Sequence, residues 1–156
     1  YADLLVGASG QDSAASNAGA LYLVTNPSSG SISTVAWGML TGEVASDNLG
    51  TAAVTIGDWD GDGVEDVVAG SRNSDRNGSN TGAAYLFYAP AAGTRNAGAA
   101  DMIWNGVNVS DYFGYTAATV PDMDGDGNDE LALSALNGGH STVAIATGAV
   151  WLWMGR

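Results

Sequence analysis

The feature that most constrains this chain of 156 residues is an internal repeat with a period of about 64 residues. Two alignments hold a constant offset of 64, and they pair segments 46–50 with 110–114 and 58–63 with 122–127. Downstream, segment 82–87 matches 148–153 at an offset of 66, which places a two-residue insertion in the polar stretch between. A third, partial copy opens the chain, because segments 3–7 and 19–23 match 66–70 and 82–86. Each unit is therefore expected to fold as one element of an array.

Short apolar segments within each unit predict β-strands. They are rich in small, β-branched and aromatic residues, and Gly, Asn, Ser and Asp fill the gaps between them, which is typical of turns. In the middle unit the expected strands are 49–56, 66–69, 83–88 and 101–104, and the last strand of the chain is 151–154. No segment carries a sustained 3.6-residue apolar period, so little or no helix is expected.

Four short strands per repeat predict an all-β fold made of β-propeller blades. We expect about ten strands, or about two and a half four-stranded antiparallel blades, in a single propeller segment spanning 1–156. The repeat units are about 1–45, 46–109 and 110–156; the first lacks its opening strand and the last stops after its third. Propellers usually have 4–8 blades and avoid open edges. Either the rest of a longer parent chain or a homo-oligomer joined through open blade edges would complete the ring, and we favour the first.

Composition excludes several classes of function. The formal net charge is −13, with 17 acidic residues, four Arg and no Lys, so the surface repels phosphate backbones and no nucleic-acid partner is expected. No cysteine is present, which excludes disulfides and thiolate chemistry. No apolar run approaches the roughly 18 residues that span a bilayer, so no membrane insertion is expected.

Two acidic loops are the candidate metal sites. Each carries acids at its first, third, fifth and ninth positions and glycines at its fourth and sixth, and the main-chain carbonyl at the seventh position offers a further oxygen. The first predicted ligand set is Asp58, Asp60, Asp62, Val64 and Asp66; the second is Asp122, Asp124, Asp126, Asn128 and Glu130. Without a cation, four carboxylates would repel one another within each loop.

Calcium is the expected ion, at two sites. Calcium takes six to eight oxygen ligands, whereas magnesium prefers to keep several waters. An EF-hand also requires Glu at position twelve followed by a helix, but that position is Ala69 or Leu133, each within a strand-like apolar run. These are therefore calcium loops that join two strands. Merely acidic turns are the alternative, which two nine-residue matches at one offset disfavour.

The units resemble the FG-GAP repeats of integrin α-subunit β-propellers and their bacterial relatives. Phe113-Gly114 stands at the family's Phe-Gly position, where Leu49-Gly50 departs from it, and the acidic loops match closely. The family's Gly-Ala-Pro element appears as Gly7-Ala8-Ser9, is degenerate at Gly70-Ser71 and is nearly absent at Ser134-Ala135. The resemblance implies that the calcium ions brace turns on one face of the propeller and that ligand binding uses other loops. It also implies a secreted or cell-surface protein.

The function expected from these observations is a non-catalytic, calcium-binding scaffold for adhesion, recognition or assembly, with an unidentified protein or glycan ligand. No enzyme is expected, because the chain has no nucleophile-elbow motif and His140 is a lone loop histidine. A carbohydrate-binding module is one alternative, in which Trp37, Trp104, Trp151 or Trp153 would stack on sugars; core packing is the favoured role of these residues. The other alternative is an accessory domain of an extracellular hydrolase or lyase.

Overall fold

A computed structural model describes residues 3–25, 38–90, 92–139 and 147–155. The described part contains eleven strands and one short 3-10 helix, η1, so the all-β class is confirmed. The strands are β1 (Leu4–Ala8), β2 (Ala20–Val24), β3 (Gly38–Thr41), β4 (Leu49–Thr55), β5 (Val67–Ser71), β6 (Ala83–Phe87), β7 (Gly93–Asn96), β8 (Met102–Asn105), β9 (Phe113–Val120), β10 (Glu130–Ala135) and β11 (Ala149–Trp153); η1 is Ala97–Ala99. Trp37 and His140 lie outside the described residues.

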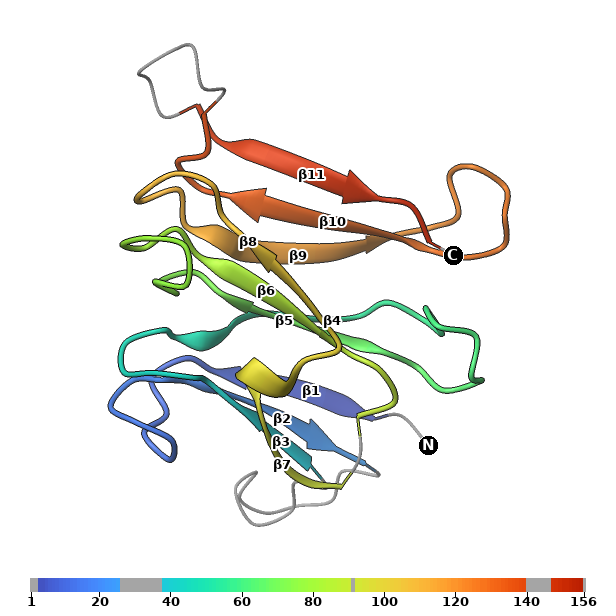
Figure 1. The fold of residues 1–156 in the computed structure, drawn as a ribbon. Helices are drawn as coiled ribbons and strands as arrows, with labels where there is room; N and C mark the ends of the chain where they lie inside the picture. The colour runs from blue at the N-terminus through green and yellow to red at the C-terminus, as the bar shows by residue number, and fades with distance from the viewer. Residues whose placement is uncertain (1–2, 26–37, 91, 140–146, 156) are drawn as a thin grey trace.

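The strands form three sheets that stack in chain order (Figure 1). We call them the N-terminal sheet (β1-β2-β3-β7), the central sheet (β4-β5-β6-β8) and the C-terminal sheet (β9-β10-β11). Neighbouring strands are antiparallel except β3 and β7, which are parallel. Within the described residues, no helix is long and apolar enough to cross a membrane.

The three hairpins β1–β2, β5–β6 and β10–β11 repeat one register. Ala8 pairs with Ala20, Ser71 with Ala83, and Ala135 with Ala149, so the third hairpin carries the longer connection. The two-residue slip in the sequence repeat therefore falls in the loop after β10, as predicted.

Strand β7 is the main correction to the predicted strands. The segment between β6 and β8 was expected to be loop, and about ten strands were expected; instead, residues Gly93–Asn96 run alongside β3 of the neighbouring sheet. The four residues have no apolar alternation, so the sequence gives no strand signal there. Their pairing satisfies main-chain groups along the edge of β3. Asn96 Nδ2 also donates to the carbonyl oxygen of Gly42 at 2.8 Å.

Two hydrophobic cores lie between the three sheets. The core between the N-terminal and central sheets has the buried rings of Tyr85 and Phe87 at its centre. In the core between the central and C-terminal sheets, Trp104 and Trp153 lie 5.3 Å apart, and Phe113 meets Trp151 edge to face at 5.2 Å between ring centroids. Core packing of these three tryptophans is thus confirmed.

The Phe-Gly pair marks a joint where adjacent sheets approach closely. Gly114 has φ +74°, and a Cβ at this position would lie 2.2 Å from the carbonyl oxygen of Ala83 in the central sheet. Phe113 is buried, donates its N–H to the carbonyl oxygen of Thr81 at 2.9 Å and bridges Gly82. Leu49-Gly50 forms the equivalent joint between the N-terminal and central sheets, where Leu49 bridges Gly19. The motif is therefore explained by backbone contact between sheets.

Candidate metal centre

The two acidic loops occupy equivalent places in the central and C-terminal sheets. One connects β4 to β5 and the other connects β9 to β10, as the repeat predicts. We call residues 58–66 loop 1 and residues 122–130 loop 2. The two loops face each other across an open cavity of about 340 Å³ lined by Ile56, Gly57, Asp58, Trp59, Gly61, Gly127, Asn128 and Asp129.

Loop 1 is folded by hydrogen bonds from its main chain to its own carboxylates. Asp58 accepts from the N–H groups of Gly61 and Gly63, both at 2.8 Å. Asp60 accepts from the N–H of Asp62 at 3.1 Å, and Asp62 accepts from the N–H of Val64 at 2.8 Å. Gly61 and Gly63 have φ of +83° and +89°, a region that other residues resist. The glycines thus let the chain wrap around the acids.

Loop 2 repeats this network residue by residue. Asp122 accepts from the N–H groups of Gly125 and Gly127 at 2.6 and 3.0 Å. Asp124 accepts from the N–H of Asp126 at 3.1 Å, and Asp126 accepts from the N–H of Asn128 at 2.8 Å. The same spacing of acids and glycines therefore produces the same local fold twice.

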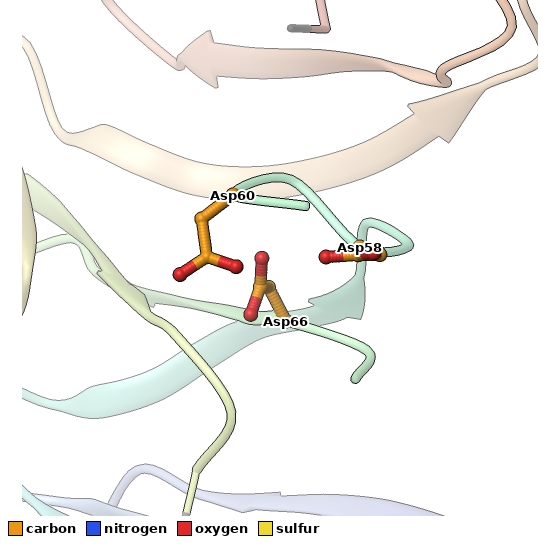
Figure 2. Close-up of side chains that lie close together, drawn as sticks. All are labelled: Asp58, Asp60 and Asp66. Atoms are coloured by element: carbon orange, nitrogen blue, oxygen red, sulfur yellow. The ribbon is translucent and has the colours of Figure 1, made fainter. Parts of the chain in front are cut away.

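Each loop brings three carboxylates together. One oxygen each from Asp58, Asp60 and Asp66 lie within 4.8 Å of one another (Figure 2), and so do oxygens from Asp122, Asp124 and Asp126. Asp62 is not part of the first group and Glu130 is not part of the second. Carboxylate oxygens gathered in this way suit a hard divalent cation such as calcium.

The acid at the ninth position is buried in both loops but has different partners. Asp66 accepts from the N–H of Trp59 at 2.7 Å and from the N–H of Ala89 at 2.9 Å. Burial raises the pKa of the Asp66 carboxyl above its ordinary value. Glu130 accepts from the N–H of Met123 at 2.8 Å through Oε2, the counterpart of the Trp59 bond.

The second oxygen of Glu130 is buried near loop 2 but lies outside its group of three carboxylates. Oε1 is buried and has no hydrogen-bond partner among the described residues, and the whole residue is 0% exposed. A buried carboxylate oxygen without a partner is costly unless a cation or another donor meets it. The three gathered aspartates of loop 2 fit a divalent cation on chemical grounds, and the Glu130 oxygen adds an uncompensated acceptor close to them in the sequence.

The two seventh-position residues stay predictions as ligands. Val64 is 49% exposed, and its main-chain N–H donates within the loop, as does that of Asn128. The expected contribution of either residue is its carbonyl oxygen, which no contact in the described part of the chain tests.

The comparison with known proteins gives one informative match. Human integrin alpha-IIb is similar to this chain. It is 30% identical over 122 residues, which cover 75% of this chain and 11% of integrin alpha-IIb. The chain thus spans about a ninth of the length of that curated relative, and the similarity to integrin alpha-IIb points to an integrin-like relationship. No family model matches the chain.

Trp59 is the residue of the site that sequence reasoning missed. It stands at the second position of loop 1, is 5% exposed and packs into the core between the central and C-terminal sheets. Its counterpart in loop 2 is Met123, which is 62% exposed. A large aromatic between two ligand-type acids is the one signal that could have identified it. Loop 1 is therefore coupled to the packing of two sheets, whereas loop 2 lies at the end of the stack.

Proposed function

We propose that this chain is a calcium-binding segment of a β-propeller that serves as a non-catalytic scaffold for adhesion, recognition or assembly outside the cell. The observation that carries the proposal is the duplicated loop: two segments one repeat apart fold into the same hydrogen-bonded cradle with converging carboxylates. The similarity to integrin alpha-IIb and the stacked sheets support an integrin-like arrangement of propeller blades.

Calcium would stabilise the scaffold by two effects. Each ion would offset two units of the formal charge of −13, and it would hold the ends of two neighbouring strands together. An ion present at about 100 times its Kd adds roughly 2.7 kcal/mol of stability where its loop is already folded without the ion. Extracellular calcium modules bind the ion with a Kd of about 10⁻⁴–10⁻³ M, so the two calcium sites would be occupied outside the cell.

A non-catalytic role is supported by where the acids lie. The described carboxylates that gather into groups of three belong to the two loops, and metal ligation accounts for their arrangement. A ligand, whether protein or glycan, would then bind elsewhere on the scaffold.

Calcium titration by calorimetry tests the proposal. The wild-type chain should bind two calcium ions, and Asp60→Ala and Asp124→Ala should each remove one. Glu65→Ala is the matched control, because Glu65 lies in loop 1 but outside the predicted ligand set. Wild-type protein that binds no calcium at millimolar concentration, or variants that both keep two sites, would contradict the proposal.

A further inference from the structure

The chain contains three Asn-Gly pairs, which are Asn77-Gly78, Asn105-Gly106 and Asn137-Gly138. Asn is a thermolabile residue, and it is most reactive before glycine. Glycine has no side chain to hinder attack by its main-chain nitrogen on the preceding Asn amide carbon. The attack closes a five-membered succinimide ring, so each pair reacts only where the fold lets these two atoms approach each other.

Two of the three pairs are held in place by the packing of their glycines. Gly106 is buried, and its N–H donates to the carbonyl oxygen of Gly82 at 2.8 Å. A Cβ on Gly106 would overlap the carbonyl oxygen of Thr81, so its main chain is closely packed. Gly138 is also buried, and its N–H donates to the carbonyl oxygen of Ala135 at 3.3 Å. Ring closure at either pair therefore requires a buried glycine to leave its place.

The pair Asn77-Gly78 lies in a different environment, within the loop that connects β5 to β6. We call residues 72–82 the β5–β6 loop. Asn77 is exposed and Gly78 is only partly buried. The N–H of Gly78 donates to the carbonyl oxygen of Asp75 at 3.1 Å, a bond within the loop's own turn. Local opening of this exposed turn frees the nitrogen of Gly78 without disturbing either core.

The side chain of Asn77 ties this loop to the next one. Its Nδ2 donates to the carbonyl oxygen of Gly106 at 2.9 Å. Gly106 opens the segment 106–112, which leads from β8 to β9 and which we call the β8–β9 connection. The reactive amide is thus also the donor of a bond between two loops.

We propose that Asn77 is the site at which the folded protein undergoes spontaneous deamidation. The main-chain nitrogen of Gly78 bonds to Cγ of Asn77 and loses its proton, and the side-chain nitrogen leaves as ammonia. Water then opens the succinimide at either carbonyl, which leaves aspartate or isoaspartate at position 77. The net reaction consumes one water and releases one ammonia, and it needs no oxidant or metal. This inference goes beyond the proposed function and does not depend on calcium ligation.

The reaction changes the contact between the two loops. The product carboxylate is ionised at neutral pH, because an ordinary aspartate has a pKa of about 3.9. It cannot donate to the carbonyl oxygen of Gly106, so two acceptors meet where a hydrogen bond stood. It also adds one negative charge to a chain whose formal net charge is already −13. Deamidation should therefore loosen the β5–β6 loop from the β8–β9 connection while both cores stay packed.

Peptide mapping by mass spectrometry tests where the reaction occurs. Trypsin cuts after Arg76 and Arg95, so peptide 77–95 carries Asn77, and peptide 96–156 carries the other two Asn-Gly pairs. After incubation of the folded protein at mildly alkaline pH, Asn77 should be converted at least about tenfold faster than Asn105 or Asn137. In urea, the three pairs should react at similar rates. Asn77→Gln should abolish the conversion in peptide 77–95, because the longer side chain cannot close a five-membered ring.

Hydrogen exchange of the variant Asn77→Asp tests the consequence. Amides of the β5–β6 loop and of the β8–β9 connection should exchange faster than in the wild type, whereas those of β10 should not change. Asn105→Asp is the matched control, because Asn105 is exposed, makes no side-chain hydrogen bond to the described residues and lies beside the same connection. It adds the same charge and should leave the exchange unaltered.

Three results would overturn the proposal. One is a folded protein in which Asn77 persists as long as the other two asparagines do. Another is a folded protein in which all three pairs react as they do in urea. The third is an Asn77→Asp variant whose two loops exchange no faster than those of Asn105→Asp.

Discussion

Glu130 distinguishes the two acidic loops at the scale of single residues. It keeps the bond to the main chain that Asp66 makes in loop 1, but its longer side chain leaves Oε1 buried without a partner among the described residues. We expect Glu130→Gln to weaken calcium binding at loop 2, because it removes the charge that balances the cation. Isothermal titration should show a loss of about tenfold or more in affinity at one site.

Glu130→Asp is the control for this effect. It places the acid of loop 1 in loop 2 and should keep the charge and the bond from the N–H of Met123. Equal weakening by both substitutions would mean that side-chain length, and not charge, governs the site.

Asp47 gives a second prediction at this scale. It is 2% exposed, and burial, reinforced by the carboxylates of Glu43 and Asp75, raises its pKa above the ordinary value. Its ionised form therefore destabilises the folded state at neutral pH, and this penalty is lost as the pH falls through the raised pKa. Asp47→Asn should raise the melting temperature at about pH 7, since the amide oxygen can still accept from the N–H of Val44.

The gain from Asp47→Asn should disappear below the unfolded-state pKa of about 3.8. Thermal melts of the variant and the wild type at several pH values measure this difference directly. The assignment would be contradicted if the variant melted below the wild type at neutral pH. It would also be contradicted if the difference in melting temperature were the same at every pH.

At the scale of elements, the joint between sheets depends on glycine at Gly114. Ala in this left-handed conformation costs about 1–2 kcal/mol, and its Cβ would also lie 2.2 Å from the carbonyl oxygen of Ala83. Gly114→Ala should therefore lower the free energy of unfolding by more than about 4 kcal/mol. Denaturant unfolding of calcium-free protein measures the effect.

Gly57→Ala separates the clash from the backbone strain. Gly57 has nearly the same φ, +72°, but a Cβ there would meet no atom within 4 Å. It should cost only the conformational term of about 1–2 kcal/mol. Equal losses at the two positions would mean that the close approach of the sheets contributes nothing.

The elements also show how far the sequence predicts the fold. The hairpin strands were predictable because apolar residues and turn residues recur at one offset. Strand β7 was not, because its residues are mostly exposed and its place is decided by the edge of β3. The spacing of the acids predicted both loops. It could not predict that Asp62 lies outside its carboxylate group while Asp126, which accepts from the equivalent N–H, lies inside the other.

At the scale of the whole molecule, the two loops are expected to differ in what they stabilise. Loop 1 cannot open without exposing Trp59, which lies in the core between two sheets. Loop 2 carries the exposed Met123 and can open locally without disturbing that core. Calcium in loop 1 should thus stabilise the packing of the central and C-terminal sheets, whereas calcium in loop 2 should order that loop locally.

Asp60→Ala and Asp124→Ala test this division of roles. In saturating calcium, Asp60→Ala should lower the free energy of unfolding by about 2–3 kcal/mol and Asp124→Ala by less than about 1 kcal/mol. Denaturant unfolding followed by tryptophan emission measures both effects. Equal losses of stability in the two variants would mean that the loops are interchangeable braces, whatever their place in the stack.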